Sequence, residues 1–223
     1  SLIGDVPRGV MLDQDPIFLG GQGGMTGPLQ LEYGTIQAAG SVLRKDVTES
    51  GQLVVPPAPR AGRRTYETGY RSVARLMKKG ATYIGNLAAL EAWYSCVRRV
   101  FLSHTDHGAA CLAGALTQLA GARKERLKRL AAVVEKIAVE DRSDMTETLC
   151  KTHEALCEGW PSVQDQLAAV GDVNGTEKDT FLAAWLAAPE ETYVARVQAL
   201  SAETKAAGTA WLQQIVATAE QAI

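Results

Sequence analysis

Apolar and polar positions near the start of the chain repeat with a period of six residues. This period fits neither the 3.6-residue period of a helix nor the two-residue period of an ordinary strand. It is typical of a hexapeptide-repeat parallel β-helix, in which each short strand buries one residue and a corner separates successive faces. The repeated positions are Leu19, Met25, Leu31, Gln37 and Leu43, each followed three residues later by Gln22, Pro28, Gly34, Gly40 or Asp46.

Three details qualify this pattern. Gly34 and Gly40 suit corners, because glycine adopts positive φ without a Cβ clash. Gln37 is polar where the period predicts an apolar residue, and between Gly4 and Ile17 the period breaks, which predicts a loop projecting from a corner. At roughly three faces per coil, residues 1–50 hold only two to three coils. So short a stack is marginal alone, and we expect earlier coils before Ser1 in the parent protein.

From Tyr66 onward the apolar residues recur with helical period, which predicts an α-helical bundle over residues 65–223. We expect a first helix to stop at Gly80, and a long helix to contain the apolar positions from Leu112 to Ile137. Pro161 is expected to break or kink a later helix, and Pro189 to open a single last one. The stretch between the two regions, residues 51–64, contains Pro56, Pro57 and Pro59 and is predicted to be an extended linker.

Composition narrows the class of protein. The chain of 223 residues is 46% hydrophobic with a formal net charge of -2, so it can bury a core. A dedicated nucleic-acid binder needs concentrated positive charge to recognise phosphate groups, so the near-neutral net charge argues against that class of protein. No apolar run is long enough to cross a membrane. The four cysteines show neither a CxxC pair nor zinc spacing, which favours a reducing cytoplasm.

Two runs carry a family resemblance. They read IFLGGQGGMTGP over Ile17–Pro28 and LEYGTIQAAGSVLRKDV over Leu31–Val47, and Ile3-Gly4-Asp5 precedes them. Together these runs cover about a fifth of the chain and resemble the last coils of hexapeptide acyltransferases. The most similar family is that of the bifunctional N-acetylglucosamine-1-phosphate uridyltransferases/glucosamine-1-phosphate acetyltransferases, in their acetyltransferase half.

The resemblance implies a left-handed parallel β-helix, a homotrimer, and acetyl-CoA as co-substrate in the groove between adjacent prisms. The fold class expected is therefore mixed and mainly α, with terminal β-helix coils over residues 1–50 followed by the bundle. Gly21 stands where the family has a serine near acetyl-CoA, so only a backbone contact carries over. Ala39 matches an alanine whose main chain contacts the cofactor. The alternative is that Gly21 and Ala39 are only corner and core residues.

A basic stretch follows the linker prolines. Acyltransferases of this type often end in a basic tail that reaches the phosphates of CoA, and Arg60, Arg63 and Arg64 are candidates for this role. Guanidinium groups pair with phosphate oxygens in a bidentate fork. The alternative, which we favour, is a solvated linker that contacts no ligand.

His104, Asp106 and His107 form a polar group between two predicted helices. A histidine beside a carboxylate can act as a base, and two histidines can contribute to a metal site. A metal site needs three or four ligands, however, and no cysteine stands at a suitable spacing. We therefore predict an exposed helix-capping loop and no metal, and a structural role for His153.

Two function classes remain open. The first is the C-terminal fragment of a sugar-phosphate acetyltransferase or nucleotidyltransferase-like enzyme of UDP-N-acetylglucosamine biosynthesis. The second is a non-catalytic trimerisation or docking module, or the oligomerisation stem of a sugar-nucleotide pyrophosphorylase. The catalytic histidine and the sugar-phosphate lysine of the resembled family lie before the phrase matched by Ile3-Gly4-Asp5. The catalytic residues are thus expected upstream of Ser1, and this chain alone is predicted to be inactive.

Overall fold

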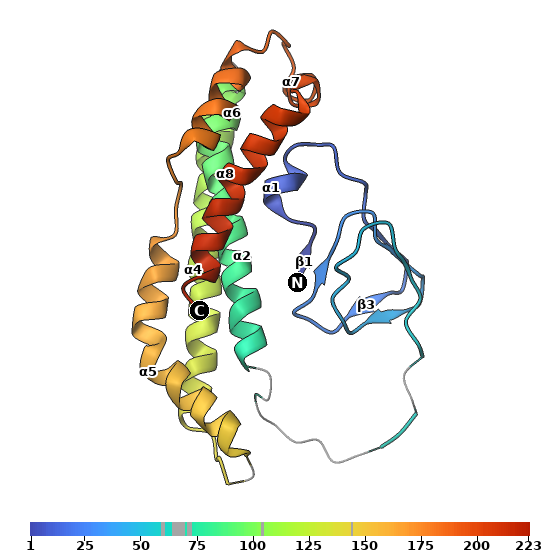
Figure 1. The fold of residues 1–223 in the computed structure, drawn as a ribbon, viewed down its shortest axis with the longest axis vertical. Helices are drawn as coiled ribbons and strands as arrows, with labels where there is room; N and C mark the ends of the chain where they lie inside the picture. Colours follow the sequence, from blue (N-terminus) through green and yellow to red (C-terminus); the bar gives the residue numbers. More distant parts are fainter. Residues whose placement is uncertain (59–60, 64–69, 71–72, 104, 144) are drawn as a thin grey trace.

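Helices and short strands occupy two regions that lie side by side (Figure 1). The computed structural model describes residues 1–58, 61–63, 70, 73–103, 105–143 and 145–223. We call residues 1–54 the strand region and residues 73–223 the helical bundle. The bundle is elongated, and the strand region lies against one of its sides with helix α1 between the two.

Seven strands of two residues each make up the sheets of the strand region. All pairs are parallel, and they form three small sheets with the orders β1-β4, β2-β5-β7 and β3-β6. The strands are β1 Leu2–Ile3, β2 Phe18–Leu19, β3 Gly24–Met25, β4 Gln30–Leu31, β5 Ile36–Gln37, β6 Val42–Leu43 and β7 Leu53–Val54. Strand β7 lies in the stretch that the sequence assigned to the linker.

The predicted left-handed β-helix is wrong for the part of the chain that the structure describes. The protein is mainly helical, and its strands belong to three separate small sheets. The six-residue period does mark where strands fall, because each repeated position is the second residue of a strand. It does not create a continuous prism core: Leu19 is 40% exposed, and the apolar cluster here contains only Leu29, Leu31 and Leu43 as buried members. The six-residue spacing determines where the strands fall. The path of the chain from one strand to the next depends on what the connecting segments pack against.

The turns between strands agree with the sequence. Gly34 and Gly40 have φ angles of +73° and +66°, the left-handed region that glycine enters without strain. The predicted projecting loop instead contains a short helix, α1 Val6–Gly9, whose first turn is capped by Asp5. The Asp5 carboxylate accepts a hydrogen bond from the Arg8 amide at 2.9 Å.

The segment around α1 docks on the bundle. The Val6 amide donates to Oδ1 of Asn86 at 2.8 Å, and the Thr209 hydroxyl donates to the Pro7 carbonyl at 3.3 Å. Met11, just beyond α1, is 1% exposed and belongs to the core of the helices. A chain segment of the strand region thereby completes the packing of the bundle.

The bundle is built around α2, which packs against α8 and α4, while α5 covers α4 and α6 packs on α8 (Figure 1). Thr146, Thr192 and Ser201 cap their helices through side-chain oxygens. The elements are α2 Val73–Trp93, the π-helix η1 Tyr94–Arg98, α3 Arg99–Leu102, α4 Gly108–Ala138, α5 Glu147–Ala169, α6 Thr176–Ala187, α7 Tyr193–Ala199 and α8 Ala202–Glu220.

Several helix boundaries correct the sequence analysis, although the long helix from Leu112 to Ile137 is confirmed by α4. Gly80 does not end a helix. It lies inside α2, where an added Cβ would be 2.7 Å from Leu130 of α4, so it permits close packing. Pro161 lies inside a continuous α5, and the single last helix predicted after Pro189 is instead α7 and α8.

Aromatic side chains fill the centre of the bundle. Trp93, Phe181, Trp185 and Trp211 are each at most 1% exposed. The rings of Trp93 and Phe181 lie 5.4 Å apart between centroids, a normal distance for a packed aromatic pair. Within the described residues, none of the helices combines the length and the apolar composition needed to cross a bilayer.

Candidate functional site

Gly21 and Ala39, the residues that the resemblance places beside acetyl-CoA, lie on neighbouring exposed turns. The Gly40 amide donates to the Gly21 carbonyl at 2.8 Å, which stacks the turn after β2 on the turn after β5. An added Cβ at Gly20 would be 2.4 Å from the Ala39 nitrogen, so Gly20 is sterically required. Gly21 has no atom within 4 Å of such a Cβ, and this exposed position has room for a larger side chain.

The arginines proposed for CoA phosphates are only partly described. Arg60 and Arg64 lie outside the described residues, and Arg63 is exposed in the segment between β7 and α2. Three cavities lined by described residues lie elsewhere on the molecule, and Gly21, Ala39 and Arg63 line none of these three.

The predicted polar group between helices is also incomplete, because His104 lies outside the described residues. Asp106 and His107 are exposed, and His107 occupies the N-cap position of α4 without a side-chain capping bond. His153 of α5 is 0% exposed, and its Nε2 lies 3.2 Å from the Tyr70 carbonyl. Across the described ranges, no three His, Cys, Asp or Glu side chains gather as a metal site requires.

Cys96 is a half-buried thiol beside a carboxylate. Its Sγ lies 3.6 Å from Oδ2 of Asp172, and this oxygen also pairs with Lys178. The other carboxylate oxygen, Oδ1, accepts a hydrogen bond from Trp211 Nε1 at 2.9 Å. Burial first, and then the negative charge of Asp172, raise the pKa of the Cys96 thiol. A raised pKa keeps the thiol protonated at neutral pH, which is the opposite of what an activated nucleophile needs.

The structure explains the polar residue in the six-residue period. Gln37 is 2% exposed, and its Nε2 donates to the carbonyls of Ser41 at 2.9 Å and Gly24 at 3.2 Å. Gly24 belongs to β3, and Ser41 lies in the connection between β5 and β6. Gln37 therefore pairs backbone groups inside the strand region, where an apolar residue would leave these carbonyls without this donor.

An ionic cluster that the sequence analysis missed connects α1 to the segment directly after β4. Arg8 forms ion pairs with Asp5 and with Glu32, the latter at 2.7 Å, and its guanidinium lies 5.1 Å from the Tyr33 ring centroid. Burial alone would raise the pKa of Glu32, but the hydrogen bonds from Arg8 and from the Tyr33 amide outweigh it and lower that pKa. In the sequence, the one sign of this cluster is an acidic residue at a helix N-cap position, Asp5, three residues before Arg8.

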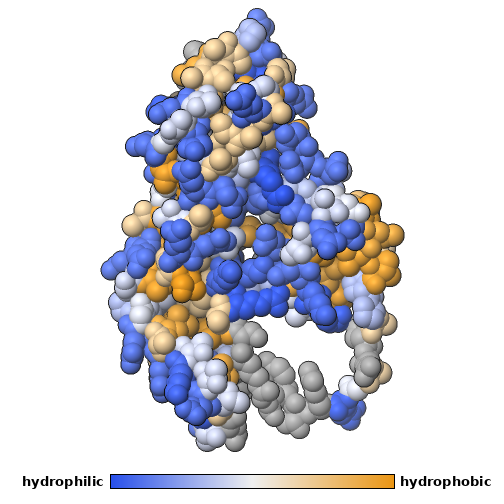
Figure 2. Space-filling view, viewed as in Figure 1, coloured by the Kyte–Doolittle hydropathy of each residue, from blue (hydrophilic) through white to orange (hydrophobic). Residues whose placement is uncertain are grey.

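The feature with the clearest functional implication is an apolar face on the sheet β2-β5-β7, which the sequence analysis also missed. Phe18, Ile36 and Leu53 are paired in register across the three strands and are 61%, 45% and 66% exposed. Val55, two residues after Leu53, is 68% exposed, whereas Leu19 pairs with the buried Gln37 and therefore lies on the opposite face of the sheet. Figure 2 shows hydrophobic side chains gathered on the strand region, on the side turned away from the helices. We call Phe18, Ile36, Leu53 and Val55 the apolar face.

Single exposed apolar residues are ordinary, but a contiguous group aligned on one sheet marks an interaction surface. Residues on the apolar face were missed because side chains alternate between the two faces along a strand. The six-residue pattern follows the second residue of each strand, such as Gln37, whereas Phe18, Ile36 and Leu53 are first residues. Comparisons of the chain with protein-family models, with curated proteins and with solved structures each give no match.

Proposed function

We propose that this chain is an assembly module whose copies associate with one another through the apolar face. The observation that carries the proposal is the alignment of Phe18, Ile36 and Leu53 as exposed residues on three hydrogen-bonded strands. An aligned sheet surface can pack against a second sheet of the same kind, with the two inner faces interdigitating.

The chemistry of the face favours a second copy as its occupant. All four of its residues are uncharged, so it offers nothing that would select a strongly charged partner. The chain carries a formal net charge of only -2, and self-repulsion between copies is therefore weak. The resemblance to trimeric acyltransferases adds the expectation of three copies.

Energetics predict a reversible association. Fully burying a large apolar side chain contributes about 1.5–3 kcal/mol, and these side chains are already partly covered, so each contributes roughly half of that. The combined contribution of the side chains from four residues in each of two copies is comparable with the cost of about 4–15 kcal/mol for lost rigid-body freedom. The association should therefore depend on protein concentration.

The test is the molar mass measured by sedimentation equilibrium at concentrations up to about 1 mM, the range of weak affinities. The unmodified chain should gain mass as concentration rises, and Leu53→Glu should remain a monomer. Leu186→Glu is the matched control, because Leu186 lies on α6 and is 64% exposed, close to the 66% of Leu53. A monomeric unmodified chain, or equal association by both variants, would refute the proposal.

Acetyl-CoA binding is the second candidate function, as the enzyme hypothesis requires. The stacked turns that present Gly21 and Ala39 on one exposed edge favour it. Calorimetric titration of acetyl-CoA would test it, with Arg60, Arg63 and Arg64 all changed to alanine as the comparison. Unchanged affinity in that variant would remove the arginines from the phosphate site, and no binding to either protein would remove the candidate.

A cytoplasmic location belongs to the same proposal. The four cysteines, Cys96, Cys111, Cys150 and Cys157, are free thiols. Free thiols in a chain with this many cysteines suit a reducing compartment.

A further inference from the structure

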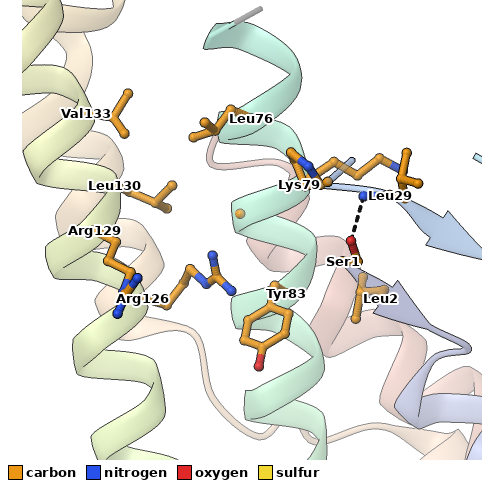
Figure 3. Close-up of a pocket in the computed structure, with 13 residues that line it drawn as sticks. Ser1, Leu2, Leu29, Leu76, Lys79, Tyr83, Arg126, Arg129, Leu130 and Val133 are labelled. Carbon is orange, nitrogen blue, oxygen red and sulfur yellow. Dashed lines mark hydrogen bonds between the residues drawn. The ribbon is translucent and has the colours of Figure 1, made fainter. Parts of the chain in front are cut away.

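A cavity of about 270 Å³ lies between the strand region and the bundle (Figure 3). One wall comes from α2, with Lys79 and Tyr83, and the opposite wall from α4, with Arg126 and Leu130. The strand region closes the cavity through the segments around Leu2 and Leu29. The cavity is thus built by three parts of the chain that are far apart in sequence.

The charges at this cavity are of one sign. Lys79, Arg126 and Arg129 line it, and none of its described lining residues is acidic. Lys79 is held by the strand region, since its Nζ lies 3.0 Å from Oδ2 of Asp46 and donates to Oε1 of Gln30 at 3.1 Å. Arg129 pairs with Glu125 on the exposed side of α4.

Arg126 is the cation without such a neutralising partner. Among the described residues, no carboxylate lies within ion-pair distance of it. Its guanidinium instead lies 4.3 Å from the centroid of the Tyr83 ring, and in Figure 3 the side chain points from α4 toward α2. Stacking on an aromatic ring orients the guanidinium and leaves its N–H groups available to an acceptor. Arg126 therefore presents a positive charge to the cavity with no carboxylate beside it among the described residues, and an anion that enters the cavity supplies that partner.

The remaining lining is apolar. Apolar lining comes from Leu76 of α2, from Leu130 and Val133 of α4, and from Pro28 and Leu29 of the strand region. At about 30 Å³ for each water-sized group, the cavity of about 270 Å³ holds a phosphate joined to one small ring or short chain.

We propose that this cavity binds a small phosphate monoester, with the phosphoryl group on Arg126 and Lys79 and the apolar part against Leu130 and Val133. Guanidinium binds phosphate oxygens in a bidentate fork, and lysine adds a point charge. Because the lining comes from both regions, an occupant bridges them and stabilises their docking by linkage. This site is distinct from the apolar face and stands independently of the proposed assembly.

The test is isothermal titration of the full chain with phenyl phosphate, inorganic phosphate and phenol as probes. Phenyl phosphate should bind more tightly than inorganic phosphate, because only the former also occupies the apolar wall. Phenol should not bind measurably, because it lacks the phosphoryl group. Arg126→Gln should weaken phenyl phosphate binding by about tenfold or more, the loss expected for one charge-assisted interaction.

Two controls separate this site from general charge effects. Lys128→Gln removes one positive charge from an exposed position on the same helix, outside the cavity lining, and should leave the affinity within about threefold of the original. Circular dichroism of each free variant verifies folding. Equal weakening by Lys128→Gln and Arg126→Gln, or no phenyl phosphate binding to the unmodified chain, would overturn the proposal.

Discussion

The bundle and the strand region are held together by different forces. The bundle core contains all four tryptophans of the chain and buries apolar side chains from nearly every helix. The strand region buries only Leu29, Leu31 and Leu43 as its own apolar cluster, and it relies on the Arg8 ion pairs and on Gln37 for the rest. A small region with so little core is stable mainly because it is attached to a larger one.

The attachment itself uses both kinds of interaction. Met11 inserts apolar surface into the bundle, and Asp46 forms ion pairs with Lys79 and Arg75 of α2. Apolar burial contributes at any moderate pH, whereas ion pairs depend on ionisation and salt. Four predictions follow this contrast, and each changes one of the two regions or the contact between them.

The largest loss of stability is expected from truncating the aromatic core of the bundle. Trp93→Ala removes a ring that is 1% exposed, packs on Phe181 and donates from Nε1 to the Tyr193 hydroxyl at 2.9 Å. We expect the free energy of unfolding to fall by about 3–5 kcal/mol. Urea unfolding measures it, and Trp93→Phe should cost clearly less because the ring is retained. Equal losses for both variants would contradict a role for ring packing.

The next largest loss of stability is expected from substituting Met11, and Met25 of the strand region is the matched comparison. Met11→Ala leaves a cavity in the bundle core and should cost about 2–4 kcal/mol. Met25→Ala changes a half-buried residue next to the small strand cluster and should cost about 1 kcal/mol. Thermal unfolding of both variants gives the comparison. If Met25→Ala destabilises more than Met11→Ala, the strand region has a stronger core of its own than we infer.

Close helix packing gives the third prediction. Gly85 lies where an added Cβ would be 2.8 Å from the Val216 backbone of α8, so Gly85→Ala should separate the two helices and cost about 1–3 kcal/mol. Gly114→Ala is the control, since Gly114 is an exposed residue of α4 with open space around it. Alanine favours a helix over glycine, so this variant should gain about 0.5–1 kcal/mol. Stabilisation by both substitutions would show that α2 and α8 are not in close contact.

Much of the bundle could be predicted from sequence, because helical period and burial coincide there. The apolar positions from Leu112 to Ile137 predicted α4 correctly. Two expectations were wrong: Gly80 does not end a helix, because packing against α4 overrides that local signal, and Pro161 does not break α5. Gly80 is decided by its close approach to Leu130 of α4, a tertiary contact that no local pattern records, whereas Pro161 is an exposed residue inside a continuous α5.

The strand region was predictable only in its spacing. The period placed five of the seven strands, and the glycines at 34 and 40 turned as expected. The winding was predicted wrongly, because the segment between Gly4 and Ile17 contains α1, which packs on the bundle together with Met11, a contact that the local sequence does not record. The apolar face and the Arg126 cavity were missed for a related reason, since their residues converge from separated segments.

The smallest effect on stability is expected from lowering the pH, which tests the contribution of the ion pairs apart from that of apolar burial. Burial would raise the pKa of Glu32, but the hydrogen bonds from Arg8 and from the Tyr33 amide outweigh it, so that pKa is lowered. The pKa of Asp46 is lowered in the same way, because the hydrogen bonds from the Gln30 amide and from Lys79 outweigh burial. A lowered pKa in the folded state contributes stability above the unfolded pKa values of about 3.9–4.3. That contribution is lost as the pH falls through the folded values.

Comparing Glu32→Gln with the unmodified chain at several pH values separates the effect of this carboxylate from general acid denaturation. At pH 7, Glu32→Gln should lower the thermal midpoint slightly, by the equivalent of about 1 kcal/mol or less, because the pair with Arg8 is close to solvent. Below about pH 4 the unmodified chain loses the same interaction by protonation. The difference between the two proteins should therefore shrink as the pH falls, and high salt should reduce it at pH 7. A difference that stays constant from pH 7 to pH 3 would mean that Glu32 stabilises the strand region by packing rather than by charge.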